Sequence, residues 1–141
     1  MPIAHKIYEE DNLFVTRSTG VVTLNDITAT LAVIEKEIIG WPSVTRVSDF
    51  SRVEVFSISP SEIRDVAERK ANILRRLNIT MRTIIIATSD EIFGLVRAYC
   101  AQAAFEGQEE AAAVRCPIEA ADWIGMTQER MADLLNLPET A

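Results

Sequence analysis

Residues 82–99 constrain the fold most, because they are typical of a buried strand that leads directly into a helix. Residues 83–87 form a short, unbroken apolar run rich in β-branched side chains, which suits a strand covered on both faces. Ser89 can cap a helix, and Asp90 and Glu91 follow in the first turn, where the helix dipole favours negative charge. A covered strand leading into a helix is half of a βαβ unit, so this segment predicts an α/β fold.

Two other helices have clear start signals. Thr23 is a good N-cap and is followed three residues later by Asp26. The run Ser59-Pro60-Ser61-Glu62 gives a cap, a proline at the first helical position and a glutamate at the third. Apolar residues then recur at helical spacing at Leu24, Ile27, Leu31, Ile34 and Ile38 in the first helix, and at Ile63, Val66, Ala67, Leu74 and Leu77 in the second.

The other expected elements complete an alternating pattern. Strands are expected at residues 4–9, 13–18, 44–50, 84–87 and 112–115, with residues 21–22 extending the second strand as a bulge. Further helices are expected at residues 90–106, 117–124 and 127–137. The resulting order, β-β-α-β-α-β-α-β-α-α, predicts a single-domain, mixed and mostly parallel sheet with flanking helices, and an antiparallel hairpin at one edge.

Charge and hydropathy favour a soluble cytoplasmic protein. The net charge of −7 argues against a general nucleic-acid binder, which would be basic. No apolar run approaches the roughly 18–20 residues that span a bilayer, so no transmembrane segment is expected. The charged N-terminus, with His5, Lys6, Glu9 and Glu10, does not fit a signal peptide.

The chain offers few residues for metal or redox chemistry. Its two cysteines, Cys100 and Cys116, are far from any CxxC spacing, and His5 is its only histidine. We therefore expect no metal site, no cofactor and no Cys-His or Ser-His catalytic pair.

Two short motifs carry a family resemblance. They are Phe93-Gly94-Leu95-Val96-Arg97-Ala98-Tyr99 and Ala120-Ala121-Asp122-Trp123, and a strand ending in Asp49-Phe50-Ser51 accompanies them. With this order of elements, residues 3–125 resemble the SpoIIAA-like bacterial proteins related to STAS and SEC14 domains. The resemblance implies a STAS-like domain over residues 1–125, with residues 126–141 as a helical extension.

The chain departs from the antagonist members of the STAS group at the second long helix. Those proteins have a phosphorylatable serine in an Asp-Ser-Ser-Gly-type segment, whereas this chain has Phe56-Ser57-Ile58-Ser59-Pro60-Ser61. The resemblance therefore does not imply a phosphorylation switch.

The same helix start is one candidate ligand site. Ser57, Ser59 and Ser61 would lie beside free backbone N–H groups that can hold an anion, with Phe56 nearby. Alternatively, Ser59 only caps the helix and the other two serines are solvated.

The Phe93–Tyr99 motif is the second candidate. Gly94 suggests a close approach by backbone or ligand, Arg97 could hold a carboxylate or phosphate, and Phe93 and Tyr99 could line the same cleft. Alternatively, Arg97 pairs with Asp49, Asp90 or a carbonyl group, and Gly94 relieves crowding. In either case, we expect binding near the carboxyl ends of the parallel strands.

Residues 52–82 contain seven basic and four acidic residues in an otherwise acidic chain. The basic residues are Arg52, Arg64, Arg69, Lys70, Arg75, Arg76 and Arg82. They could receive an acidic partner or an anionic headgroup. Alternatively, Glu–Arg pairing along a solvated helix neutralises most of them.

The C-terminal helix is amphipathic through Met126, Met131, Leu134, Leu135 and Leu137. It either covers the chain's own core or pairs with a second copy, and the second alternative predicts a homodimer.

Three functions remain open. The first is a non-catalytic STAS-like binding or regulatory module with an unknown protein partner, which the resemblance implies. The second, suggested by the SEC14 side of the resemblance, is a carrier of a small apolar or lipid-like ligand, in a cleft lined by Phe93, Val96, Tyr99 and residues near Phe56. A hydrolase or transferase is the third, although no general base is evident in the sequence.

Overall fold

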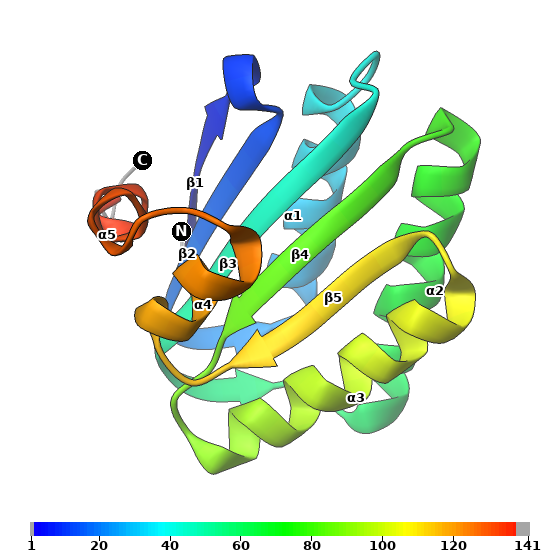
Figure 1. Ribbon diagram of the computed structural model, residues 1–141. Coiled ribbons are helices and arrows are strands. Elements are labelled where there is room, and N and C mark those ends of the chain that lie inside the picture. Colours follow the sequence, from blue (N-terminus) through cyan, green and yellow to red (C-terminus); the bar gives the residue numbers. More distant parts are fainter. Residues whose placement is uncertain (1, 138–141) are drawn as a thin grey trace.

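Three helices cover one face of a five-stranded sheet, and two short helices lie against the other face (Figure 1). The computed structural model describes residues 2–137. The strands are β1 (Ile3–Tyr8), β2 (Leu13–Thr23), β3 (Ser43–Ser57), β4 (Thr80–Ile86) and β5 (Glu109–Val114). The helices are α1 (Leu24–Glu37), α2 (Pro60–Leu77), α3 (Asp90–Glu106), α4 (Pro117–Ile124) and α5 (Gln128–Leu135), and a single 3-10 turn, Glu9–Asp11, joins β1 to β2.

The strands lie in the sheet in the same order as in the sequence. β1 pairs antiparallel with β2, and the other three pairs are parallel. Each parallel crossover therefore advances by one strand in the same direction, and right-handed crossovers place α1, α2 and α3 on the same face. The predicted α/β class, with a mostly parallel sheet and an antiparallel edge hairpin, is confirmed.

Both sequence-predicted helix starts are confirmed as reciprocal caps. The Thr23 hydroxyl accepts from the Asp26 backbone N–H, and the Asp26 carboxylate accepts from the Thr23 N–H at 2.9 Å. Ser59 and Glu62 make the same pair of bonds at the start of α2. Each cap satisfies backbone donors that the helix cannot pair internally.

The third strand is longer than predicted. We expected it to end near Phe50 with a polar segment after it, but β3 continues to Ser57. Residues 52–57 pair with residues 19–23 of β2, and β2 has register shifts between Arg17 and Thr19 and between Gly20 and Val21. Residues 21–22 extend the second strand as predicted, but the irregularities lie just before them. These irregularities bend the β2–β3 ribbon beyond the end of β4, which pairs with β3 only as far as Asp49.

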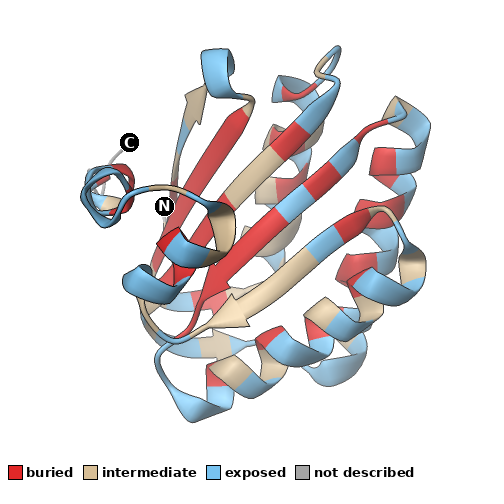
Figure 2. Ribbon diagram, viewed as in Figure 1, coloured by how far each residue is buried: buried red, intermediate tan, exposed pale blue. Residues whose placement is uncertain are grey.

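The two faces of the sheet carry separate apolar cores, and β3 and β4 contribute to both (Figure 2). Under α1, α2 and α3, Phe50 and Ile85 pack against Leu31, Ile63 and Val96. On the other face, Val15, Val47 and Ile84 contact residues of α4 and α5. Strands covered on both faces have unbroken apolar runs, which explains the composition of residues 83–87.

The last helix belongs to the chain's own core. Met131 is fully buried and Leu134 is 3% exposed, and both pack in the same cluster as Val15 and Val47. Of the two alternatives for this helix, the structure therefore supports packing within the chain. The expectation that its apolar stripe needs cover from a second copy is wrong for Met131 and Leu134, because the sheet already covers them. The division into a domain at residues 1–125 and an extension at residues 126–141 remains a prediction, and so does the homodimer.

The guanidinium of Arg82 fixes α4 beside the sheet. It lies 4.1 Å from the centre of the Trp123 ring and donates to the Trp123 carbonyl oxygen at 3.0 Å.

None of the helices within residues 2–137 has the length and apolar character needed to cross a membrane.

Candidate functional site

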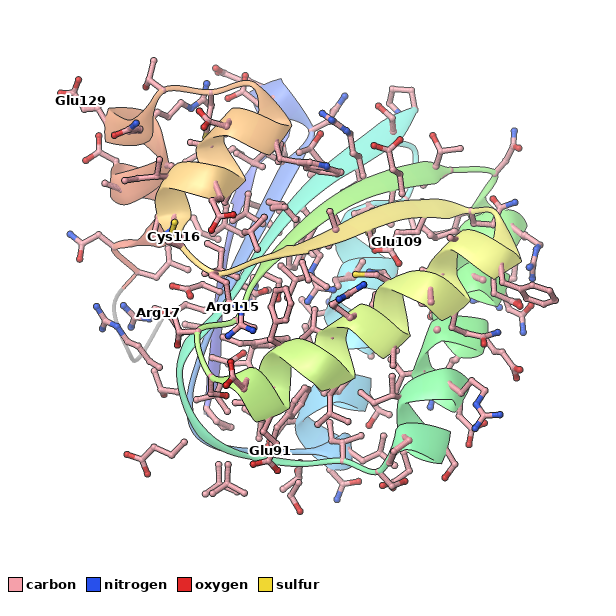
Figure 3. All side chains as sticks on the ribbon, turned by 60° about the horizontal axis from the view of Figure 1, so that its bottom comes forward. Arg17, Glu91, Glu109, Arg115, Cys116 and Glu129 are labelled. Atoms are coloured by element: carbon pink, nitrogen blue, oxygen red, sulfur yellow. The ribbon has the colours of Figure 1, made fainter. Side chains whose placement is uncertain are left out.

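A buried carboxylate lies between the sheet and the helices α2 and α3. Glu109, at the start of β5, accepts a hydrogen bond from the Lys70 ammonium at 2.6 Å. It also accepts hydrogen bonds from the hydroxyl groups of Thr83 and Tyr99. Figure 3 shows Glu109 where β5 runs beside α3. All four side chains are buried, so this network joins β4, β5, α2 and α3 by bonds that water does not weaken.

The cluster fixes the charge of each member. Burial alone would raise the pKa of Glu109, but Lys70, Thr83 and Tyr99 together hold it below its ordinary value. Burial lowers the pKa of Lys70 to about 8, although Glu109 opposes this shift. Burial and the Glu109 charge raise the pKa of Tyr99 well above its ordinary value. At neutral pH the cluster therefore holds an ammonium, a carboxylate and a neutral phenol.

A second cation, Arg46, lies beside this cluster without a carboxylate of its own. It is in β3, where it is next to Phe14 of β2 and Thr83 of β4 on the helix-covered face. Its Nη2 donates to the Thr16 hydroxyl at 3.4 Å, and its Nε is buried with no partner among the described residues. Burial lowers the pKa of Arg46, partly offset by Tyr99 and Glu109. A buried charged donor without a partner costs at least about 1–3 kcal/mol, so this arrangement needs an explanation.

A cavity of about 50 Å³ contains these two cations at one end and apolar walls over the rest. Its polar lining comes from Thr30, Arg46, Ser48, Lys70 and Tyr99. Its apolar lining comes from Ile27, Leu31, Phe50, Phe56, Ile58, Ile63, Val66, Ile85 and Val96. A site with apolar walls and a few convergent polar groups is the usual form of a small-molecule pocket.

Three of the sequence-predicted site residues line this cavity, and Val96 is one of them. Phe56 and Tyr99 are among its lining residues, and the Phe56 ring lies 5.2 Å from the Phe50 ring, centre to centre. Ile27, Thr30 and Phe56 are partly exposed and form the rim near the carboxyl end of β3, and Arg46 is also partly exposed. The cavity therefore extends from the carboxyl end of β3 toward the middle of the sheet.

The three serines do not line the cavity. Ser59 caps α2, its hydroxyl lies 3.1 Å from that of Ser61, and Ser57 ends β3. All three are exposed. Of the two alternatives for these serines, the structure therefore shows the capping role for Ser59.

Arg97 and Gly94 lie on the exposed side of α3, whereas Tyr99 faces the core. The expectation that Arg97 and Tyr99 line one cleft is therefore wrong, because Tyr99 follows the buried positions Ile92 and Val96 while Arg97 does not. A Cβ placed on Gly94 would meet no atom within 4 Å, so crowding within the protein does not account for this glycine.

Phe93 has a different neighbour from those expected. The Arg115 guanidinium lies 3.9 Å from the centre of its ring and also pairs with Asp90 at 2.7 Å. Arg115 thus follows β5 and holds the first turn of α3, which is where Figure 3 places it. Asp90 takes this arginine rather than Arg97.

The basic segment at residues 52–82 is largely neutralised by acids from other elements. Arg75 pairs with Glu106, Arg76 with Glu35, Arg82 with Glu110 and Lys70 with Glu109. Four of its seven cations therefore pair across elements rather than along α2.

Within residues 2–137, no cluster of three or more His, Cys, Asp or Glu side chains has the arrangement of a metal site.

Sequence reasoning missed Arg46 and Glu109 as site residues and treated Lys70 only as part of a basic surface. For Lys70 a signal was present, since it continues the apolar helical spacing of Ile63, Val66 and Leu74. A lysine on the inner face of an amphipathic helix indicates a buried charge. Arg46 and Glu109 lie in strands, where successive side chains point to opposite faces of the sheet. The sequence does not show whether such a face borders a cavity or solvent, so it gave no signal for these two residues.

Comparison with solved structures places this architecture among known folds. A crystal structure of an uncharacterised protein of the DUF3478 family, with a SpoIIAA-like fold, from Shewanella loihica PV-4 is similar to this chain with a TM-score of 0.51. The similarity covers 86% of this chain and 90% of that one, at 16% sequence identity. The chain has a SpoIIAA-like fold. No family model and no curated protein matches it.

The SpoIIAA-like fold agrees with the resemblance that the Phe93–Tyr99 motif suggested. At this level of identity the similarity concerns the fold alone, and function has to be argued from the site. In this SpoIIAA-like chain the described site is the cavity with Arg46 and Lys70 at its polar end.

Proposed function

We propose that the protein is a non-catalytic binding module whose ligand is a small, largely apolar molecule held in the cavity between the sheet and α1, α2 and α3. The observation that carries this proposal is the lining itself: nine apolar side chains and five polar ones, contributed by five different elements and the loop that follows β3. Such a cavity lies beneath the helices that the sequential strand order places on one face.

The state of Glu109 supports binding rather than catalysis. It is the carboxylate of the buried cluster, and Lys70, Thr83 and Tyr99 all donate to it. A general base needs a free lone pair directed at the substrate and a pKa near the working pH. Glu109 has its pKa lowered and its oxygens engaged, so its role is to hold Lys70 and Tyr99 in position.

The size of the cavity limits the ligand. A volume of about 50 Å³ receives a small group, and any longer apolar chain continues past the rim at Ile27 and Phe56. The ligand is therefore a short amphiphile or a small ring compound rather than a bilayer lipid with two acyl chains.

Filling the cavity tests the proposal. Val66 lines it and is 7% exposed, so Val66→Phe should occupy the space at a stability cost of about 1–3 kcal/mol. Val55 is 52% exposed outside the cavity, and Val55→Phe is the matched control. Binding of octanoate and octanamide is measured by calorimetry for the three proteins, with circular dichroism to confirm folding.

We expect at least one probe to bind the wild type and Val55→Phe, and neither probe to bind Val66→Phe. The probe should be recovered chemically unchanged after the titration. Absence of binding by both probes, or equal binding by Val66→Phe, would overturn the proposal. Conversion of a probe to a product would favour the hydrolase or transferase alternative.

A further inference from the structure

We infer that the ligand is a monoanion with an apolar body, and that Arg46 and Lys70 hold its carboxylate at the polar end of the cavity. This inference rests on the proposed function and adds the chemical class of the ligand. It starts from the charges around the cavity.

The charge of the described site does not balance. Two cations, Arg46 and Lys70, line the cavity, and Glu109 is the acid that acts on both of them. Glu109 is already bonded to Lys70 at 2.6 Å. One positive charge therefore remains on Arg46, a partly exposed residue whose Nε is buried, and a single carboxylate would neutralise it.

The geometry of Arg46 agrees with this charge count. Its Nε–H is buried without a partner among residues 2–137, and its Nη2 makes only a long bond, 3.4 Å, to Thr16. When the side chain turns this edge toward the cavity, its Nε–H and an Nη–H side by side match the two oxygens of a carboxylate. Ser48, which also lines the cavity, accepts from the Thr16 hydroxyl and can donate its own hydroxyl hydrogen to the same anion.

The rest of the lining specifies the body of the ligand. The walls from Arg46 toward the rim are aliphatic and aromatic, with Ile63, Val66 and Phe50 among them. A highly charged anion such as a free phosphate would leave these walls in contact with unneutralised charge. The carboxylate of an apolar monocarboxylic acid would pair with the cations at one end of the cavity, and its apolar body would contact the aliphatic and aromatic walls.

A pair of probes of equal shape tests the charge requirement. Octanoate and octanamide share the same chain and differ in the charge of the head. We expect the wild-type protein at pH 7 to bind octanoate about 10–100-fold more tightly than octanamide, because hydrogen bonds to charged groups contribute that much. Calorimetric titration measures both affinities.

Variants at Arg46 locate the effect. Arg46→Met removes the charge and keeps a long apolar side chain. The preference for octanoate should therefore shrink to the part that Lys70 supplies, while the affinity for octanamide is unchanged. Arg46→Lys keeps the charge without the fork and should give an intermediate preference. Arg64→Met, at an exposed position of α2, is the matched control and should bind as the wild type does.

The outcomes separate this inference from the proposed function. If octanamide binds as tightly as octanoate to the wild type, the anionic head is wrong while the cavity proposal stands. If Arg46→Met keeps the full preference for octanoate, the assignment to Arg46 is wrong. If neither probe binds the wild type, the proposed function fails and this inference fails with it.

Discussion

A lysine surrounded by apolar side chains keeps its charge only when a carboxylate lies beside it. Lys70 is 2% exposed, and Glu109 supplies that carboxylate. The two residues are far apart in the sequence, on α2 and β5, so neither one alone indicates the pair. Because the pKa of Lys70 is lowered to about 8, its charge changes within an accessible pH range.

This titration predicts a pH dependence of ligand binding. The ammonium form of Lys70 dominates below pH 8, and the neutral amine dominates above it, so the cavity loses one positive charge as the pH rises. Octanoate is ionised throughout this range. Its affinity should therefore be constant from pH 6 to 7 and fall above pH 8, by at most about tenfold per pH unit.

Titrations of octanoate and octanamide at pH 6.5, 7.5 and 9 check the expectation. Octanamide is the control, because its binding does not depend on the cavity charge. If the affinities for both probes fall together as the pH rises, or if neither affinity falls, Lys70 does not act on the ligand.

The elements differ in how far the sequence specifies them. The capping residues Thr23 and Ser59 locate the starts of α1 and α2 to the residue, because each cap is a local interaction within four residues. The end of β3 is set instead by pairing with β2 through Thr23 and Ser57, which are far apart in the chain. The packing of α5 likewise depends on residues far away in the chain. The sequence therefore predicts this helix but not the surface that it covers, because its apolar stripe could pack on the chain's own sheet or on a partner.

The packing of α5 predicts the effect of a charge at Met131. Met131 is fully buried against β2 residues such as Val15. Met131→Glu would place a carboxylate in that core, so it should lower the free energy of unfolding by more than about 3 kcal/mol. Urea denaturation followed by circular dichroism measures the change.

Glu129 is the control for this substitution, because it is exposed on the same helix. Glu129→Gln should leave the urea midpoint within about 0.5 kcal/mol of wild type. A Met131→Glu protein that stays fully stable and sediments as a smaller species than wild type would instead restore the interface role of this helix.

The whole molecule is organised around β3 and β4, which have strand neighbours on both sides and apolar cores on both faces. The sequence predicts this arrangement well, because unbroken apolar runs and alternating elements restrict the topology. It predicts the cavity poorly, because Arg46, Lys70 and Glu109 come together from β3, α2 and β5 only when the sheet forms.

Amide exchange should reveal this organisation directly. Val47 and residues 84–86 should exchange slowest, with protection near that of global unfolding. Residues 52–57, which extend past the end of β4 and pair on one side with β2, should exchange much faster. Equal protection across all of β3 would contradict the assignment of residues 52–57 to a bent ribbon.

The strand order also determines when each face of the sheet is covered during synthesis. The helices α1, α2 and α3 emerge between the strands they cover, whereas the opposite face waits for α4 and α5. From Ile86 to Leu135 a ribosome adds residues at roughly 5–20 per second, so the face around Val15, Val47 and Ile84 lacks its complete cover for about 2–10 s. In a cell, that interval is when this protein is most open to chaperones and to aggregation.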